Sequence, residues 1–456
     1  MFFKQFKVEG LGCLSYMIGC PMAGQAIVVD PKRDIDDYLQ TAAAYGMVIT
    51  GIIDTHVHAD HISGAQELKA ATGAPIFISH AAGVPYDHKP LREGDRLVVG
   101  KAIIEVVATP GHTPHAVTLA VTDRARGETP QLLLTGDLLF VGSIGRPDLA
   151  GGELLDEQIA NLYNSLHTKL STFPDLVEIY PAHGEGSLCG SGISAKPSST
   201  LGFERATNPY FQLSFEEFKK TLTTSLPVRP KNFSHIIAQN RQGPELVRNL
   251  HIPQRLSVAL IKQAIAEGAL VIDIREAAAF GGAHIPGSIN VGFSPQSPTW
   301  LGMVVDPGSR LIIIAASVSD AGQAIVGFRR AGYDGIVGYH IGMNDWIFSG
   351  EQVGFLPQLS IHGLKQVLEK YGDHIVLDVR TPDEWEAGHI HGAVHVPLHE
   401  LIEKGFDASK EAHISVICRT GYRANIAASL LKSRGYRHVY SVIGGMTAWE
   451  RAAAHA

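Results

Sequence analysis

The segment 55–61 reads Thr-His-Val-His-Ala-Asp-His and places three imidazoles and one carboxylate within seven positions. It directly follows an apolar run that predicts a β-strand. Because side chains alternate along a strand, His56 and His58 can converge, while Asp60 and His61 turn inward from the loop. Neutral imidazole and carboxylate are side chains that bind catalytic transition metals in proteins. The segment therefore predicts a metal centre at the end of a strand.

Three further ligand-type residues, His112, Asp137 and His183, stand beside glycines at predicted strand-to-turn junctions. A single Gly-His or Gly-Asp pair is usually only a turn. Together with the first segment, they give seven candidate ligands on loops at strand ends, where a rigid fold carries functional groups. This coincidence favours a metal site over histidines that bond only to one another. The residues alone leave open whether one ion or two would bind.

The elements that must position these residues are short β-rich runs separated by Gly and Pro turns, which continue to about residue 190. Examples of predicted strands are 102–108 and 116–122. From 204 to 254 the composition turns polar and partly helical, and we interpret this stretch as a domain tail and linker.

The second half of the chain contains a duplication. Four ordered segments of one copy match segments of the other, namely 270–275 with 375–380, 282–287 with 387–392, 330–333 with 433–436 and 341–346 with 444–449. Each copy alternates apolar strands with helices, which predicts a parallel sheet with helices on both faces.

The second copy carries a cysteine, Cys418, between an apolar strand and a predicted helix. A thiol at such a junction faces backbone N–H groups and the positive end of a helix dipole. Arg419 and Arg423 add positive charge, so the reactive thiolate form is favoured. The first copy has Ala315 where Cys418 stands and Asp320 where Arg423 stands, so we expect it to be a structural or docking module.

Composition and charge narrow the partner classes. A net charge of −7 offers no basic stripe for nucleic acid. No run approaches the roughly 18 apolar residues of a membrane helix, and the N-terminus lacks the layout of a signal peptide. Four scattered cysteines do not form a disulfide framework. These features predict a cytoplasmic protein of two to four domains with neither a nucleic-acid nor a membrane partner.

Residues 1 to about 240 resemble the metallo-β-lactamase superfamily, whose signature is the H-x-H-x-D-H loop followed by the later His, Asp and His. The resemblance implies an αββα sandwich that usually holds two zinc ions and hydrolyses esters, lactams or thioesters. The segments 55–64, 135–137 and 145–148 are more closely similar to the persulfide dioxygenases.

This finer resemblance implies one Fe(II) per chain, bound by His56, His112 and Asp137. Two imidazoles and one carboxylate form the facial triad of non-haem Fe(II) oxygenases and leave three positions open for substrate sulfur and O2. The remaining members of the signature would orient the ligands and hold water, and these are His58, Asp60, His61 and His183.

Two residues are implied to bind substrate. Arg146 resembles a family residue that contacts the carboxylate of the thiol substrate, although a surface turn or an ion pair with Asp148 is an open alternative. The segment 184–190 departs from the glutathione-using members and resembles bacterial fusions with appended rhodanese domains. Cys189 in this segment would receive or present sulfur near the iron, or would be a small buried residue.

Residues 358–456 resemble a rhodanese domain, which carries sulfane sulfur as a cysteine persulfide. The resemblance implies that Cys418 is the carrier and that Arg419 and Arg423 hold the anionic substrate. Four residues separate Cys418 from Arg423, whereas related phosphatases have five, so the spacing favours sulfur transfer over phosphate chemistry.

The resulting hypothesis has three parts: a metallo-β-lactamase-fold dioxygenase domain with its tail and linker (1–250), a rhodanese-like domain without the cysteine (256–352) and a catalytic rhodanese domain (358–456). The two rhodanese-like domains are expected to be doubly wound α/β folds. We expect a cytoplasmic homo-oligomer that uses O2 to oxidise a persulfide of glutathione, coenzyme A or another thiol to sulfite. Sulfur transfer through Cys418 would then give thiosulfate.

Two other functions are weighed against this hypothesis. A binuclear zinc thioester hydrolase of the glyoxalase II type would use His58, Asp60, His61 and His183 as true ligands. A sulfur-relay protein without N-terminal catalysis would only dock partners through its first domain.

Overall fold

The computed structural model describes residues 1–224, 226 and 228–454. The chain divides into two compact units. The first comprises Met1–Leu250 with Phe328–Gly332, and the second comprises His251–Gly327 with Tyr333–Ala456.

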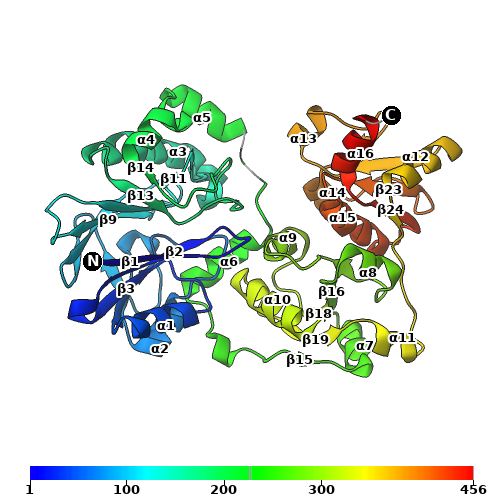
Figure 1. The fold of residues 1–456 in the computed structure, drawn as a ribbon, viewed down its shortest axis with the longest axis horizontal. Coiled ribbons are helices and arrows are strands. Elements are labelled where there is room, and N and C mark those ends of the chain that lie inside the picture. Colours follow the sequence, from blue (N-terminus) through cyan, green and yellow to red (C-terminus); the bar gives the residue numbers. More distant parts are fainter. Residues whose placement is uncertain (225, 227, 455–456) are drawn as a thin grey trace. The chain divides into compact units, whose positions relative to one another are not determined.

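The first unit contains two six-stranded sheets (Figure 1). In the first sheet the strand order is β1 (Phe2–Lys7), β2 (Leu14–Cys20), β3 (Gln25–Val29), β4 (Val48–Ile53), β5 (Ile76–Ser79) and β6 (Lys89–Leu91). In the second the order is β14 (Ser199–Thr200), β13 (Glu178–Pro181), β10 (Leu132–Gly136), β9 (Val117–Asp123), β8 (Ala102–Ala108) and β7 (Arg96–Val99). A short pair, β11 (Leu139–Phe140) and β12 (Ser143–Ile144), follows β10.

The two sheets pack face to face through the apolar side chains on the inner sides of their strands. In β8, for example, burial alternates along most of the strand. The core between the sheets combines Tyr16 and Ile18 of β2 with Ile104 of β8 and Leu119 of β9.

Helices cover the outer face of each sheet. The first sheet packs against α1 (Asp36–Ala44) and α2 (Ala65–Thr72), and the second against α3 (Leu155–Asn164) and α5 (Phe215–Thr224). The short helix α4 (Leu201–Thr207) follows β14. Figure 1 shows α1 and α2 on one side of the paired sheets and α3 to α5 on the other. The αββα sandwich expected from the sequence is therefore confirmed.

The stretch 204–254 is more ordered than a tail and linker. It forms α5 and α6 (Asn232–Gln242), which bury Phe218, Leu222, Phe233 and Ile236. The few apolar residues recur at helical spacing, so a polar overall composition still gives each helix one side that packs on the sandwich.

The second unit contains two five-stranded parallel sheets with the same topology. The first has the order β15 (Gln254–Arg255), β19 (Ile336–Ile341), β18 (Leu311–Ala315), β16 (Leu270–Asp273) and β17 (Ile289–Asn290). The second has the order β20 (Gln358–Leu359), β24 (His438–Val442), β23 (His413–Ile417), β21 (Ile375–Asp378) and β22 (Val394–His395). The central strand β18 is buried along its whole length, as expected for a strand covered on both faces.

The helices of the two copies correspond as well. The first copy has α7 (Val258–Ala266), α8 (Ala277–Gly282), α9 (Ser297–Val304), α10 (Val318–Arg330) and α11 (Asn344–Phe348). The second has α12 (Ile361–Lys370), α13 (Pro382–Glu386), α14 (Leu398–Lys404), α15 (Tyr422–Ser433) and α16 (Gly445–Ala454). These sheets and helices confirm the expected pair of doubly wound α/β domains. Within the described residues, no helix is both long and apolar enough to cross a membrane.

Candidate metal centre and Cys418 loop

Three side chains from three loops converge at one edge of the sandwich. His56 follows β4, His112 follows β8 and Asp137 follows β10, and all three are fully buried. One ligand atom from each lies within 4.8 Å of the others. Asp137 Oδ2 is 3.2 Å from His112 Nε2 and 3.8 Å from His56 Nε2. These three atoms have no hydrogen-bond partner among the described residues. Because unpartnered buried polar atoms are costly, this arrangement fits a bound cation.

In both histidine ligands, the second ring nitrogen, Nδ1, is held in place by a hydrogen bond. His112 Nδ1 donates to the carbonyl oxygen of Arg146 at 2.8 Å. His56 Nδ1 lies 3.0 Å from Thr55 Oγ1, whose own hydrogen is donated to Asp30 Oδ2 at 2.9 Å. Thr55 therefore accepts from His56. In both imidazoles the proton is on Nδ1, so the Nε2 lone pair is directed to the centre.

The ionisation of the three side chains suits metal binding. Burial lowers the pKa of His56 and His112, so both imidazoles stay neutral. Burial alone would raise the pKa of Asp137, but the neighbouring imidazole of His183, which bonds to Asp137 Oδ1, holds it well below its ordinary value. The centre therefore offers two neutral nitrogens and one negative oxygen.

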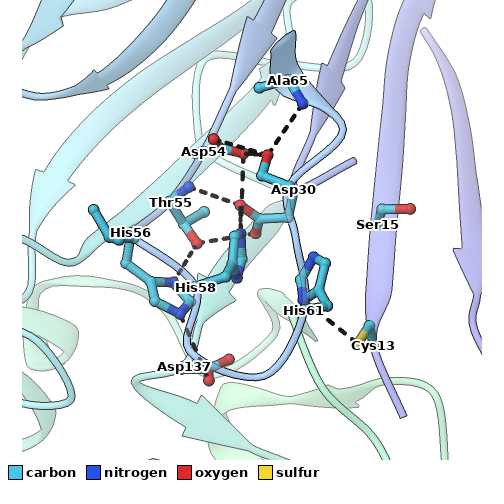
Figure 2. Close-up of polar contacts among 12 residues, drawn as sticks. Cys13, Ser15, Asp30, Asp54, Thr55, His56, His58, His61, Ala65 and Asp137 are labelled. Carbon is cyan, nitrogen blue, oxygen red and sulfur yellow. Dashed lines mark hydrogen bonds and ion pairs between the residues drawn. The ribbon is translucent and has the colours of Figure 1, made fainter. Parts of the chain in front are cut away.

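Asp30, at the end of β3, holds the loop that carries His56 (Figure 2). Its carboxylate accepts from Thr55 N at 2.7 Å and from Thr55 Oγ1, and it lies 3.1 Å from His58 Nε2. Asp30 has a φ of 50°, the only positive φ of a non-glycine residue in the described chain. Such strain persists where the surroundings fix it, here by these bonds.

Asn240 of α6 holds the same loop from the other side. Its Nδ2 donates to the carbonyl oxygens of His58 and His61 at 2.9 and 2.8 Å. Its Oδ1 accepts from Ser63 N at 2.9 Å. The helix that the sequence assigned to a linker thus supports the metal loop.

Three of the four remaining signature residues, Asp60, His61 and His183, form a second buried cluster together with Cys13, whereas His58 groups with Asp30 and Asp54. His183 Nδ1 lies 2.6 Å from Asp137 Oδ1, and its Nε2 lies 2.8 Å from Asp60 Oδ2. Cys13 Sγ donates to Asp60 at 3.2 Å, and Figure 2 shows this thiol against His61. Although burial lowers the pKa of His183, the two carboxylates raise it well above its ordinary value. His183 is therefore an imidazolium that fixes the orientation of Asp137.

Gly145 lies where the backbone passes close to the proposed metal ligands, and a larger residue would not fit there. A Cβ added to Gly145 would overlap the carbonyl oxygen of Asp137 and lie 3.0 Å from His112 Nδ1. The close approach of this segment lets the adjacent Arg146 carbonyl reach His112.

The two predicted substrate-binding residues are both buried. The guanidinium of Arg146 bonds to both oxygens of Asp148, at 2.6 and 2.8 Å, and to the Leu188 carbonyl oxygen. Cys189 is fully buried, and its Sγ lies within 4.8 Å of ligand atoms of Asp137 and His183. Burial raises the pKa of the Cys189 thiol well above its ordinary value, so the thiol is neutral. The predicted substrate-binding roles of both residues stay predictions.

Cys418 lies at the end of β23, at the start of a loop that leads into α15. Its Sγ accepts from Gly421 N at 3.1 Å, so the loop amide stabilises negative charge on sulfur. Arg423 bonds to both carboxylate oxygens of Glu384 at 2.7 Å. Arg419 lies 3.1 Å from Glu450. Both predicted anion-binding arginines are therefore already paired.

The structure supports the alignment of the two copies at this point. Ile417 O accepts from Val379 N, and Ile314 O accepts from Ile274 N. Residues 274 and 379 are matched in the duplication, so Ala315 occupies the position of Cys418, as predicted.

Sequence reasoning missed five residues that act through others: Cys13, Asp30, Thr55, Asn240 and Glu384. Thr55 directly precedes the signature and could have been found as a local partner of His56. Glu384 ends a Thr-x-x-Glu pattern that is typical of a capping box, so sequence could have placed it at a helix start. Cys13, Asp30 and Asn240 are single residues with no motif around them, and they reach the site only through the fold.

Comparisons with known proteins agree with this architecture. The model of the metallo-β-lactamase superfamily matches residues 8–183, and that of the rhodanese-like domain matches 257–348 and 360–452. The mitochondrial persulfide dioxygenase ETHE1 of Bos taurus is 31% identical over 232 residues, which cover 50% of this chain and 82% of that protein. A hydroxyacylglutathione hydrolase of a Polaromonas species is 34% identical over 172 residues, or 37% of this chain and 61% of that protein.

Among solved structures, a metallo-β-lactamase from Staphylococcus aureus superposes with a TM-score of 0.68 at 30% identity. The match covers 75% of this chain and 99% of that one, so it extends beyond the first unit. The chain therefore belongs to the metallo-β-lactamase superfamily, as a relative of the persulfide dioxygenases that continues into two rhodanese-like domains.

Proposed function

We propose that the first unit oxidises the outer sulfur of a low-molecular-weight persulfide at a single Fe(II). The balanced reaction is R–S–SH + O2 + H2O giving R–SH, sulfite and two protons. The observation that carries the proposal is the set of three unpartnered ligand atoms on His56, His112 and Asp137. A bound Fe(II) would supply open coordination positions where O2 and a sulfur atom meet. The naming of ETHE1 relatives as persulfide dioxygenases supports this substrate class.

The protein residues would direct this chemistry by orienting the ligands. His183, held between Asp60 and Asp137, turns Asp137 Oδ2 towards the centre. The burial of the site excludes water from the reacting groups. We propose Cys189 as a neutral thiol beside the substrate sulfur, and Arg146 as a contact for the substrate carboxylate that must compete with Asp148.

We further propose that Cys418 carries sulfur. Its thiolate would attack the outer sulfur of R–S–SH, form a Cys418 persulfide and release R–SH. Sulfite would then take that sulfur, giving thiosulfate and the free thiolate. The Gly421 amide bonded to Sγ supports a charged sulfur at this position. The reported match to a rhodanese-like domain over 360–452 supports this class of reaction.

A binuclear zinc thioester hydrolase is the second candidate. His58 Nδ1 and His61 Nε2 are also buried without partners, and they would suit a second ion. A hydroxyacylglutathione hydrolase is among the relatives. Two observations argue against this candidate. Both ring nitrogens of His183 are hydrogen-bonded to carboxylates, of Asp137 and Asp60. The side chain of His58 lies with those of Asp30 and Asp54, and not with the three proposed iron ligands.

The decisive experiment measures metal content and O2 uptake together, with glutathione persulfide and coenzyme A persulfide compared. We expect one iron per chain and one O2 consumed per sulfite formed. His56→Ala, His112→Ala and Asp137→Ala should lose the metal, whereas His61→Ala should retain it. Two zinc ions with no O2 uptake would refute the dioxygenase. The thiol carrier, the cytoplasmic location and the homo-oligomeric state stay predictions.

A further inference from the structure

Glu384 and Arg423 form a two-point ion pair beside Cys418. Arg423 Nη1 donates to Glu384 Oε2 and Nη2 donates to Oε1, each at 2.7 Å. Glu384 thus binds the outer end of the guanidinium. In the described part of the chain, the guanidinium makes no other hydrogen bond. The edge formed by Nε–H and the second N–H of Nη2 is therefore free to bind two oxygens.

Glu384 is itself fixed by the start of α13. Its Oε2 accepts from Thr381 N at 3.0 Å and from Thr381 Oγ1 at 3.1 Å, and the Thr381 side chain accepts from Glu384 N. This is a capping box. Burial opposes the charge on Glu384, but the bonds from Arg423 and Thr381 lower its pKa to about 2. The carboxylate is therefore ionised throughout the neutral range and holds Arg423 continuously.

The first copy shows which polar features the fold itself needs. Asp273 and Arg275 form a buried pair at 2.6 Å, and their equivalents Asp378 and Arg380 form the same pair at 2.7 Å. An aromatic ring also stacks on the same histidine in both copies, as Phe280–His284 at 3.9 Å and Trp385–His389 at 3.7 Å. These features persist without a thiol, so they serve the fold.

The Glu384–Arg423 pair behaves differently. In the first copy, Ala279 stands at the position of Glu384 and Asp320 at that of Arg423. The copy that lacks the cysteine thus lacks both members of the pair, although its sheet and helices are complete. The ion pair is therefore present only in the copy that has the cysteine, and the fold does not require it.

We propose that Glu384 is a positioning residue for sulfur transfer at Cys418. It holds the outer end of Arg423 so that the Nε edge binds the oxygens of a sulfur oxyanion, sulfite or thiosulfate. The inference rests on the proposed role of Cys418 as carrier. In the step concerned, the sulfite lone pair attacks the outer sulfur of the Cys418 persulfide anion. The bond from that sulfur to Cys418 breaks, thiosulfate leaves and the electron pair stays on the Cys418 thiolate.

The test uses the full chain with Glu384→Gln, because glutamine at this position can still cap α13 but accepts from only one N–H of Arg423. One control matches it. Glu386→Gln removes an equal charge from the same helix at an exposed residue that makes no contact with Arg423 in the described part of the chain. Cys418 is first loaded with glutathione persulfide and its mass is checked. Its discharge is then timed with sulfite and with uncharged 2-mercaptoethanol.

We expect Glu384→Gln to raise the KM for sulfite by about tenfold and to leave the rate with 2-mercaptoethanol within about twofold. The Glu386→Gln control should behave like the wild type with either acceptor. An unchanged KM for sulfite, an equal loss with both acceptors or faster discharge to sulfite would overturn the inference while leaving the carrier role intact. Absence of a persulfide on wild-type Cys418 would instead overturn the proposed function, and the inference with it.

Discussion

Replacing Asn240 by alanine tests whether α6 holds the metal loop. Asn240 is 5% exposed and makes three hydrogen bonds to the backbone of the loop, at 2.8 to 2.9 Å. The substitution leaves two carbonyl oxygens and one N–H without partners. Each unsatisfied buried group costs about 1 to 2 kcal/mol, so the sum is about 3 to 6 kcal/mol if no water enters. A domain has a total stability of about 5 to 15 kcal/mol, so the loss is large.

The effect should reach the metal, although Asn240 touches no proposed ligand. Two of its partners are backbone carbonyls of the segment that carries His56. Residues that orient ligands typically change metal affinity by about 10- to 100-fold when they are removed. We therefore expect Asn240→Ala to lose metal on dialysis, to unfold at lower urea concentration and to exchange the amide hydrogens of residues 55–64 faster.

Two variants make this result specific. Gln242→Ala truncates an amide at the exposed end of the same helix and should leave all three measurements unchanged. Asn240→Asp keeps the size of the side chain but places a carboxylate against the His58 and His61 carbonyl oxygens, so it should be at least as damaging as alanine. If Asn240→Ala retained its metal and its unfolding free energy to within about 0.5 kcal/mol, the assigned role of α6 would be wrong.

Four further predictions concern Cys418, Ala315 with Asp320, Gly145 and Glu384. Cys418→Ser should retain O2 consumption but release sulfite in place of thiosulfate; unchanged thiosulfate output in a product assay would contradict the carrier role. Ala315→Cys should give little sulfurtransferase activity unless Asp320→Arg accompanies it, and a fully active single variant in the same assay would refute this. Gly145→Ala, which leaves no room for its methyl group, should lower the metal content of the purified protein at least about tenfold; full metal occupancy would contradict it. Glu384 has a folded pKa of about 2, below its ordinary value of 4.5, so its ion pair stabilises the protein above about pH 4.5 and less as the pH falls from 4.5 towards 2. Wild type should therefore exceed Glu384→Gln by about 1 to 2 kcal/mol at pH 7, after allowance for solvent, and by progressively less below pH 4.5. Urea unfolding followed by the four tryptophans, all in the second unit, measures this difference, and a gap independent of pH would exclude the ion pair as its source.

Site residues could be predicted from the sequence where a local pattern, such as the end of an apolar strand, also fixes a position in the fold. The seven candidate ligands could be found because they lie where apolar strands end. The choice of His56, His112 and Asp137 among them came from the resemblance to the persulfide dioxygenases and not from the pattern itself. The duplication could be aligned because its matched segments are continuous in the chain. By contrast, Asn240 lies 177 residues from Ser63, and no local feature distinguishes it from any other helical asparagine. Arg146 had two open interpretations, and its pairing with Asp148 depends on a loop conformation that local sequence does not determine.

Both proposed sites are organised in the same physical way. The side-chain atom assigned to bind the metal or the oxyanion is left without a partner, while another atom of the same side chain is held by a neighbour. His56 is held by Thr55, His112 by the Arg146 carbonyl, and Arg423 by Glu384. Displacements of about 1 Å at reacting groups can cost about 100-fold in rate, so these partners matter as much as the groups they hold. It follows that restoring only a cysteine and an arginine to the first copy leaves the arginine unheld. Ala279→Glu should be the third change that such a copy requires.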